Sequence, residues 1–358
     1  MTRSLVALMM AAALLSGVGQ SAHAVTQPGR AQDLFVGAWI FYKGSFVAED
    51  GRVVDNGNAG VSHSEGQGYG MLLAVAADDH QAFDKMWSWT QGALMVREDD
   101  SLSAWRWDPA SDPNVADPNN ATDGDLLVAW ALLRAYRKWS DPTYFAAAEK
   151  IATDIANKAV VTYRGGTYML PGAEGFWYDE DEAGPIVNPS YWVYPALDEL
   201  RVFAPGFPAD RLIQSGLKLN DKARFGEAAL PADWTVLTAK GPEPAEQYPA
   251  TYGYNAIRVP LYLAWYGKVD ASVYEPFENL WQAMPEPSVV DLVTGKAVSS
   301  MHDAGYRVIE TLVSCAQGRT PSGNPAEMLE MVRYYPSTLS MLSLLAMVER
   351  YPQCLDAN

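Results

Sequence analysis

Two short acidic motifs hold the residues of this chain that are best suited to acid–base chemistry. Glu65 lies in the segment 64–71, SEGQGYGM, where small residues surround one carboxylate. Asp123 and Asp125 lie in the segment 119–125, NNATDGD, which runs into an apolar stretch. A carboxylic acid placed in a cleft can protonate the oxygen of a glycosidic bond.

Tryptophans supply the flat apolar faces that sugar rings stack on. Trp105 and Trp107 flank Arg106 between the two motifs, and Trp177 and Trp192 follow later. Together with the carboxylates they predict chemistry on sugars. Some of these tryptophans are expected in the core instead, and Arg106 is expected to pair with an acid in the cleft.

Each carboxylate also has a purely structural interpretation. Glu65 precedes a helical pattern and could contact the free N–H groups at its start. Asp123 and Asp125 flank Gly124 at the start of another helix, where aspartate commonly caps the backbone. We expect one of these two aspartates to serve the helix and the other to face a cavity.

The elements that must position these residues are helical. The segment 125–133 is apolar nearly all round, as in a buried helix, whereas 143–158 carries charges among its alanines. Buried and amphipathic helices together fit an inner and an outer ring of six. A β-hairpin is expected over 162–170, with Gly165-Gly166 as its turn. The predicted helices cover 32–43, 68–77, 80–94, 125–138, 143–160, 190–203, 210–219, 254–266, 271–283, 303–316, 326–334 and 337–349.

Prolines mark several boundaries. Asp141-Pro142 and Asn324-Pro325 place a capping side chain before a proline, which a helix tolerates in its first turn. Pro195 and Pro260 lie inside helical patterns and are expected to kink or end those helices.

The beginning of the chain reads as a signal peptide. Arg3, an apolar run over 5–15 and the Ala22-His23-Ala24 site predict cleavage after Ala24 and a secreted or periplasmic protein. Residues 25–358 are expected to form one catalytic domain, because no linker composition interrupts them.

Charge and cysteine content limit the partners. The chain has 26 basic and 43 acidic residues, a net charge of −17. This argues against nucleic acid and anionic lipid as partners, and no stable membrane insertion is expected. Cys315 and Cys354 are the two cysteines. A disulfide between them and two free thiols are both open, and no metal signature is present.

The two acidic motifs, with the pieces 169–176 (MLPGAEGF), 188–191 (NPSY) and 254–262 (YNAIRVPLY), resemble glycoside hydrolase family 8. The similarity runs from about residue 36 to 348. The resemblance implies an all-α fold, an (α/α)6 barrel with a small β-hairpin element. It implies hydrolysis of internal β-1,4 bonds of a glucan chain with inversion, and neither cofactor nor metal.

The resemblance also implies roles for individual residues. Glu65 corresponds to the proton donor, and Asp123 to the aspartate at the central sugar, which the family signature labels catalytic. Trp105 and Trp107 are expected to stack on the substrate. Water or substrate positioning is expected of Tyr191, Tyr254, Asn255 and Arg258.

One position departs from the family pattern. Many members have aspartate, taken as the base, where this chain has Asn255, and an amide cannot accept a proton from water. The expected base is Asp123, followed by Glu246 and Asp303.

Several alternatives follow from that departure. The chain could be a catalytically impaired glucan-binding protein, or a relative that acts on xylan, chitosan or mixed-linkage glucan. Its role could be to assist bacterial cellulose biosynthesis beside the cellulose synthase machinery, or to digest plant material.

Overall fold

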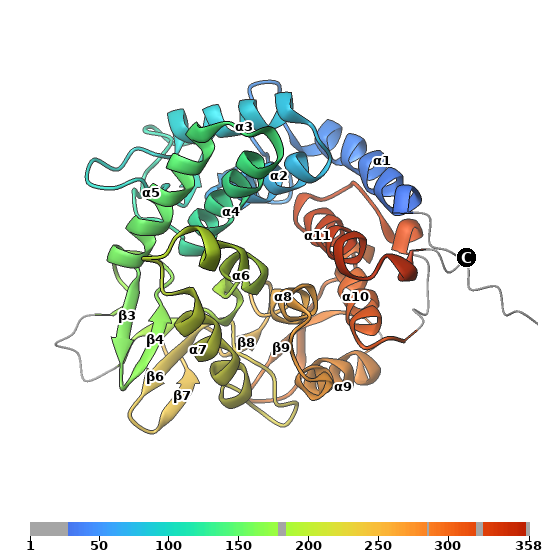
Figure 1. The fold of residues 1–358 in the computed structure, drawn as a ribbon. Helices are drawn as coiled ribbons and strands as arrows, with labels where there is room; N and C mark the ends of the chain where they lie inside the picture. Colours follow the sequence, from blue (N-terminus) through green and yellow to red (C-terminus); the bar gives the residue numbers. More distant parts are fainter. Residues whose placement is uncertain (1–27, 178–183, 285, 320–324, 356–358) are drawn as a thin grey trace, which may run out of the picture.

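The computed structural model describes residues 28–177, 184–284, 286–319 and 325–355, so the predicted signal peptide lies outside the described residues. Helices in two concentric layers form a ring (Figure 1), which confirms the predicted (α/α)6 barrel. The inner helices are α2 (Ser64–Ala76), α4 (Thr122–Trp139), α6 (Tyr194–Phe203), α8 (Arg258–Tyr266), α10 (Val308–Ala316) and α11 (Tyr334–Arg350). The outer helices are α1 (Pro28–Phe46), α3 (His80–Ala93), α5 (Pro142–Lys158), α7 (Ala209–Lys222) and α9 (Glu275–Ala283).

Burial separates the two layers in the way that the sequence pattern predicts. Every residue of α4 from Thr122 to Leu133 is buried. In α5, by contrast, only one stripe is buried, with Ala148, Ile151 and Ile155 at helical spacing. The predicted start signal of α5 is also confirmed, because the Asp141 carboxylate accepts the N–H of Thr143 at 2.8 Å.

The described part of the chain contains eleven α-helices, so the prediction of a twelfth over 326–334 is wrong. Only Pro325–Met328 form a short 3₁₀ turn, η4. The backbone just before α11 bonds to a side chain instead of to a helical turn. Asn56 donates to the carbonyl of Val332 and accepts the N–H of Tyr334, both at 2.9 Å. The predicted cap at Asn324 lies outside the described residues.

Several inner and outer helices begin later than predicted, because a 3₁₀ turn precedes them. These turns are η1 (Pro189–Tyr191), η2 (Ala271–Tyr274) and η3 (Ala304–Arg307); η5 (Pro352–Cys354) follows α11. Pro195 and Pro260 lie in the first turns of α6 and α8, where a missing N–H breaks no helical bond. They therefore begin these helices, and the expectation that they kink or end them is wrong.

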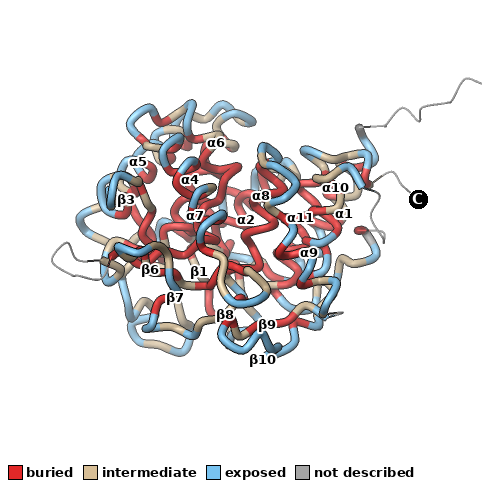
Figure 2. The backbone as a smooth tube through the Cα atoms, turned by 90° about the horizontal axis from the view of Figure 1, so that it is seen from below, coloured by how far each residue is buried: buried red, intermediate tan, exposed pale blue. Residues whose placement is uncertain are grey.

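The predicted hairpin is present as β3 (Val160–Tyr163) and β4 (Gly166–Met169). Its turn residues are Arg164 and Gly165, with φ of 46° and 80°, so the turn lies one residue earlier than predicted. Figure 2 shows strands β7 to β10 gathered at one end of the ring. The other strands are β1 (Ser62–His63), β2 (Arg106–Trp107), β5 (Ile186–Val187), β6 (Thr235–Thr238), β7 (Gly241–Pro244), β8 (Thr251–Tyr252), β9 (Ser288–Asp291) and β10 (Ala297–Ser300).

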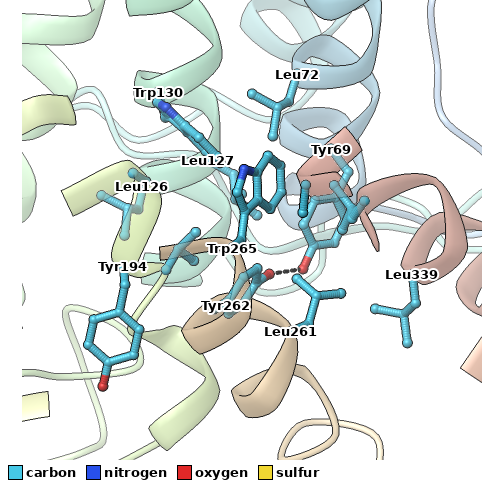
Figure 3. Close-up of a cluster of buried hydrophobic side chains, with 14 of the residues drawn as sticks. Tyr69, Leu72, Leu126, Leu127, Trp130, Tyr194, Leu261, Tyr262, Trp265 and Leu339 are labelled. Carbon is cyan, nitrogen blue, oxygen red and sulfur yellow. Dashed lines mark hydrogen bonds between the residues drawn. The ribbon is translucent and has the colours of Figure 1, made fainter. Parts of the chain in front are cut away.

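Aromatic side chains fill the centre of the ring. The indole rings of Trp130 and Trp265 lie 5.1 Å apart, and the hydroxyls of Tyr69 and Tyr262 are hydrogen-bonded at 2.5 Å (Figure 3). A disulfide joins Cys315 to Cys354, with the Cα atoms 6.1 Å apart, and so ties α10 to η5. Among the described helices, none is long and apolar enough to cross a membrane.

Glycines let α2 and α4 cross at close range. A Cβ on Gly68 would lie 2.6 Å from Leu127 Cβ and 3.1 Å from the backbone nitrogen of Val128. A Cβ on Gly124 would meet the backbone nitrogen of Glu65 at 2.7 Å. The close crossing therefore holds the two acidic motifs next to each other.

We predict that Gly68→Ala destabilises the protein by about 1–3 kcal/mol, because the added methyl overpacks a rigid crossing. Thermal unfolding measures this as a Tm lower by several degrees. Gly92→Ala is the matched control, since a Cβ at Gly92 would have no atom within 4 Å and alanine favours a helix. An unchanged Tm for Gly68→Ala would contradict the close packing of α2 on α4.

Candidate active site

A cleft of about 810 Å³ opens where the inner helices begin. Each inner helix, or the 3₁₀ turn before it, contributes a lining residue from its first turn. The positive ends of helix dipoles meet there and favour negative charge. The lining residues from these six starts are Glu65, Asp123, Tyr191, Arg258, Tyr306 and Tyr334.

Arg258 joins the two acidic motifs. Its Nη1 donates to Oε2 of Glu65 at 2.5 Å and to Oδ2 of Asp123 at 2.9 Å. Its Nη2 donates to Oδ1 of Asn255 at 2.8 Å, and Tyr69 accepts a longer bond of 3.2 Å. The arginine side chain is 1% exposed, so its charge is balanced almost entirely by these partners.

Glu65 and Asp123, the carboxylate pair, both accept a hydrogen bond from the same nitrogen of Arg258. Burial, followed by the charge of Glu65, raises the pKa of Asp123, and Arg258 offsets part of this rise. The pair therefore keeps a proton to higher pH than two isolated carboxylates would. Oxygens that both bond one nitrogen at 2.5 and 2.9 Å are also closer than the roughly 6.5–9.5 Å that leaves room for a water in an inverting pair.

Tyr191 lines the cleft beside this pair. The guanidinium carbon of Arg258 is 5.8 Å from the centroid of its ring. Burial and then the charge of Asp123 raise the pKa of Tyr191 well above its ordinary value. Its hydroxyl therefore stays protonated and can donate a hydrogen bond.

Asp125 has a structural position. Its carboxylate accepts the backbone N–H of Ser103 at 2.7 Å and the amide of Asn120 at 2.9 Å. Burial raises its pKa to about 7, against these hydrogen bonds. The expectation is confirmed for Asp123, which lines the cleft, and is wrong for Asp125, which holds neighbouring loops and does not cap its own helix.

The tryptophans also divide. Trp105 lines the cleft and donates to Asp117 at 3.0 Å. Trp107 lies outside the lining and contacts Arg52, whose guanidinium carbon is 4.8 Å from the ring centroid. Residues two apart share a face only in a regular strand, and Trp105 lies outside β2, which begins at Arg106. The two rings therefore diverge, and the expectation that Trp105 and Trp107 both face the substrate is wrong for Trp107.

The other two tryptophans and Arg106 lie away from the cleft. Trp192 is core, donating to the carbonyl of Leu212 at 2.8 Å. Trp177 contacts Tyr163, with ring centroids 5.9 Å apart, and is not among the lining residues. Arg106 pairs with Asp108 at 2.8 Å and not with an acid lining the cleft.

The loop that carries Tyr254 and Asn255 is held by a residue that sequence reasoning missed. One oxygen of Asp233 accepts the backbone N–H groups of Gly253, Asn255 and Ala256, at 3.1, 3.1 and 2.7 Å. Both Tyr254 and Asn255 line the cleft. No local pattern around Asp233 indicates this contact, because its partners lie about twenty positions away.

An aromatic wall of the cleft was also missed. Trp234 lines it with Phe176, at nearly parallel ring planes and 5.9 Å between centroids. Tyr248 stacks on Trp234 at 4.4 Å and stabilises its orientation. Trp234 follows the missed Asp233 in sequence, and neither belongs to the recognised motifs.

The alternative base candidates lie in different places. Glu246 is exposed and is not part of the lining, so the structure does not bring it to the cleft. Asp303 does line the cleft, and its carboxylate lies 3.5 Å from Nη1 of Arg333. Asp55, which lies outside the recognised motifs, lines the same cleft.

Comparison with known proteins agrees with this geometry. Residues 3–349 match the family model described as glycosyl hydrolases family 8. An endoglucanase of Cellulomonas uda is 41% identical over 252 residues, 69% of this chain and 68% of that protein.

Solved structures extend the likeness to the whole fold. An endo-β-1,4-glucanase of Acetobacter xylinum matches with a TM-score of 0.80 and 33% identity, over 89% of this chain and 99% of that one. A family 8 endo-β-1,4-glucanase from an Achatina fulica gut metagenomic library matches with a TM-score of 0.77 and 38% identity, over 87% and 98%. The predicted resemblance is therefore confirmed, and the chain belongs to glycosyl hydrolase family 8.

Proposed function

We propose that this glycoside hydrolase is an endo-β-1,4-glucanase that cuts internal bonds of cellulose or a related glucan with inversion. The single observation that carries the proposal of glycosidic cleavage is the carboxylate pair bound by Arg258 in an aromatic-lined cleft. Inversion follows from the family resemblance and not from this pair. Relatives that carry the names endoglucanase and endo-β-1,4-glucanase support the choice of substrate.

The residues divide the work by position. Glu65 donates a proton to the leaving glycosidic oxygen, drawing on the proton that the carboxylate pair retains. Asp123 and Tyr191 hold the sugar ring at the cleavage point, next to Arg258. Trp105 and Trp234 offer stacking faces along the cleft. The assignment of Asp123 as base stays a prediction, and its closeness to Glu65 disfavours it.

We also propose export, with the mature chain beginning after Ala24. The Cys315–Cys354 disulfide supports this, because disulfides persist in oxidising compartments. Work beside a cellulose synthase machinery is one role such an exported enzyme could have. N-terminal sequencing of the protein recovered outside the cytoplasm tests the cleavage site.

A second candidate function is glucan binding without cleavage, which Asn255 favours. Its amide oxygen accepts from Arg258, so the side chain holds the loop but cannot remove a proton from water. Reducing ends released from carboxymethylcellulose, xylan, lichenan and chitosan separate the alternatives. Release from chitosan alone would overturn the cellulose assignment, and binding without any release would favour the second candidate.

We predict that Glu65→Gln lowers kcat on cellohexaose by ~10²–10⁴-fold, because glutamine cannot donate a proton to the leaving oxygen. Steady-state kinetics measure kcat, and calorimetry measures retained cellohexaose binding. Glu149→Gln, an exposed change on the outer helix α5, is the matched control and keeps full activity. Wild-type kcat in Glu65→Gln would exclude Glu65 as the donor.

We predict a rate that falls on the alkaline side. The raised pKa of Asp123 means that the carboxylate pair holds its proton below that pKa and loses it as pH rises. The pH profile of kcat/KM reports the free enzyme and should decline above the usual range of an aspartate. If kcat/KM stays constant up to the pH at which the protein unfolds, the proton held by the carboxylate pair is not required for catalysis.

A further inference from the structure

The identity of the base is open, and the inference that follows rests on the proposed inverting hydrolysis. Asn255 cannot accept a proton, and Asp123 lies too close to Glu65 for a water to fit between them in an inverting pair. Among the residues described, the other carboxylates lining the cleft belong to Asp55, Asp117 and Asp303.

Two of these three are occupied by other partners. Asp117 accepts the indole N–H of Trp105 at 3.0 Å and the backbone N–H of Asn119 at 2.9 Å, one on each oxygen. It is exposed and positions the stacking tryptophan. Asp303 forms an ion pair with Arg333, whose Nη1 lies 3.5 Å from its carboxylate.

Asp55 has a different environment. Its Oδ1 accepts the backbone N–H of Gly57 at 2.9 Å, and within the described ranges no lysine, arginine or histidine lies at ion-pair distance. It is half-buried, and this burial raises the pKa of Asp55, although the N–H of Gly57 and the nearby His63 offset part of the rise. A carboxylate of this kind accepts a proton more readily than one paired with a cation.

The backbone holds Asp55 firmly on the hairpin that leads to Glu65. Its N–H donates to the carbonyl of Val61 at 2.9 Å, and its carbonyl accepts the N–H of Gly60 at 2.9 Å. Val61 then runs through β1 into α2, which begins one residue before Glu65. The same loop is bonded to the start of α11, because Asn56 accepts the N–H of Tyr334.

The surroundings of Asp55 place it near the part of the cleft that Tyr254 and Asn255 line. Asp55, Tyr254 and Tyr306 line the same cleft, and Asp55 is near enough to raise the pKa of Tyr306, after burial, Tyr254 and Asp303. The rings of Tyr306 and Tyr254 lie 6.3 Å apart. Asp55 therefore borders the same region as the residues expected to position the water.

We propose that Asp55 is the base that accepts a proton from the attacking water. The water oxygen forms the new bond to the anomeric carbon as one of its protons moves to Asp55. The bond from that carbon to the glycosidic oxygen breaks, and its electron pair takes the proton donated by Glu65. Exchange with solvent then returns Asp55 to its anionic form and Glu65 to its protonated form.

Asp55→Asn tests this assignment, with kcat on cellohexaose expected to fall ~10²–10⁴-fold while KM changes little. A second substrate, β-cellobiosyl fluoride, needs no proton donor for its leaving group. Asp55→Asn should lose activity on both substrates, whereas Glu65→Gln should recover much of its activity on the fluoride. Added azide, which needs no base, should restore turnover of the fluoride by Asp55→Asn.

Controls separate this inference from folding and from the proposed function. Asp50→Asn changes an exposed aspartate of the turn just before this hairpin, which accepts the N–H of Arg52 at 3.1 Å, and should keep full activity. Cellohexaose binding by Asp55→Asn, measured by calorimetry, shows that the cleft is intact. If Asp55→Asn fails to fold, Asp55→Ser replaces it, and the restoration of fluoride turnover by azide is measured with that variant.

Three outcomes would overturn the inference. Asp55→Asn could keep kcat within a few-fold of wild type while Asp303→Asn loses it, which would assign the base to Asp303. Loss on cellohexaose with full activity on the fluoride would make Asp55 part of the acid machinery. A β-anomer as the first product, seen by proton NMR, would show retention, whereas a wild type without any hydrolysis would overturn the proposed function itself.

Discussion

One buried guanidinium holds this active site together. Arg258 bonds carboxylates from α2 and α4 and the amide of Asn255, although Glu65 and Arg258 are 193 positions apart in the sequence. Breaking a buried ion pair typically costs about 3–5 kcal/mol, because the remaining charge is left without a partner. The positions of both catalytic motifs therefore depend on a residue that belongs to neither.

The barrel supplies the conditions that this ion cluster requires. Its inner helices begin at the same end, so their positive dipole ends favour the two carboxylates, while the aromatic core beneath excludes water. Tyr69 connects the two levels, because its hydroxyl bonds both Arg258 and Tyr262. The glycines at the α2–α4 crossing bring the motifs within reach of one arginine. The contacts that pack α2 against α4 therefore also position the carboxylates of the active site.

Local patterns predicted much of this molecule. The apolar run after Asp125 and the cap at Asp141 each determine structure within a few residues, and the predictions from them were confirmed. Errors arose where distant partners decide. Asn56 bonds the backbone before α11, and Asp233 holds the loop of Asn255. Trp107 contacts Arg52 and does not line the cleft. A missing base at Asn255 was visible in the sequence, but a replacement could be sought only in the folded cleft.

The organising role of Arg258 is tested most directly by kcat for Arg258→Lys on cellohexaose, with Tm recorded for the same sample. Lysine keeps the positive charge, but its single ammonium cannot reproduce the planar fork that reaches Glu65, Asp123 and Asn255 together. We expect a folded protein whose kcat is lower by at least ~10²-fold, as when a preorganised donor is removed. A folded Arg258→Lys enzyme with wild-type kcat would contradict the claim that this guanidinium organises the site.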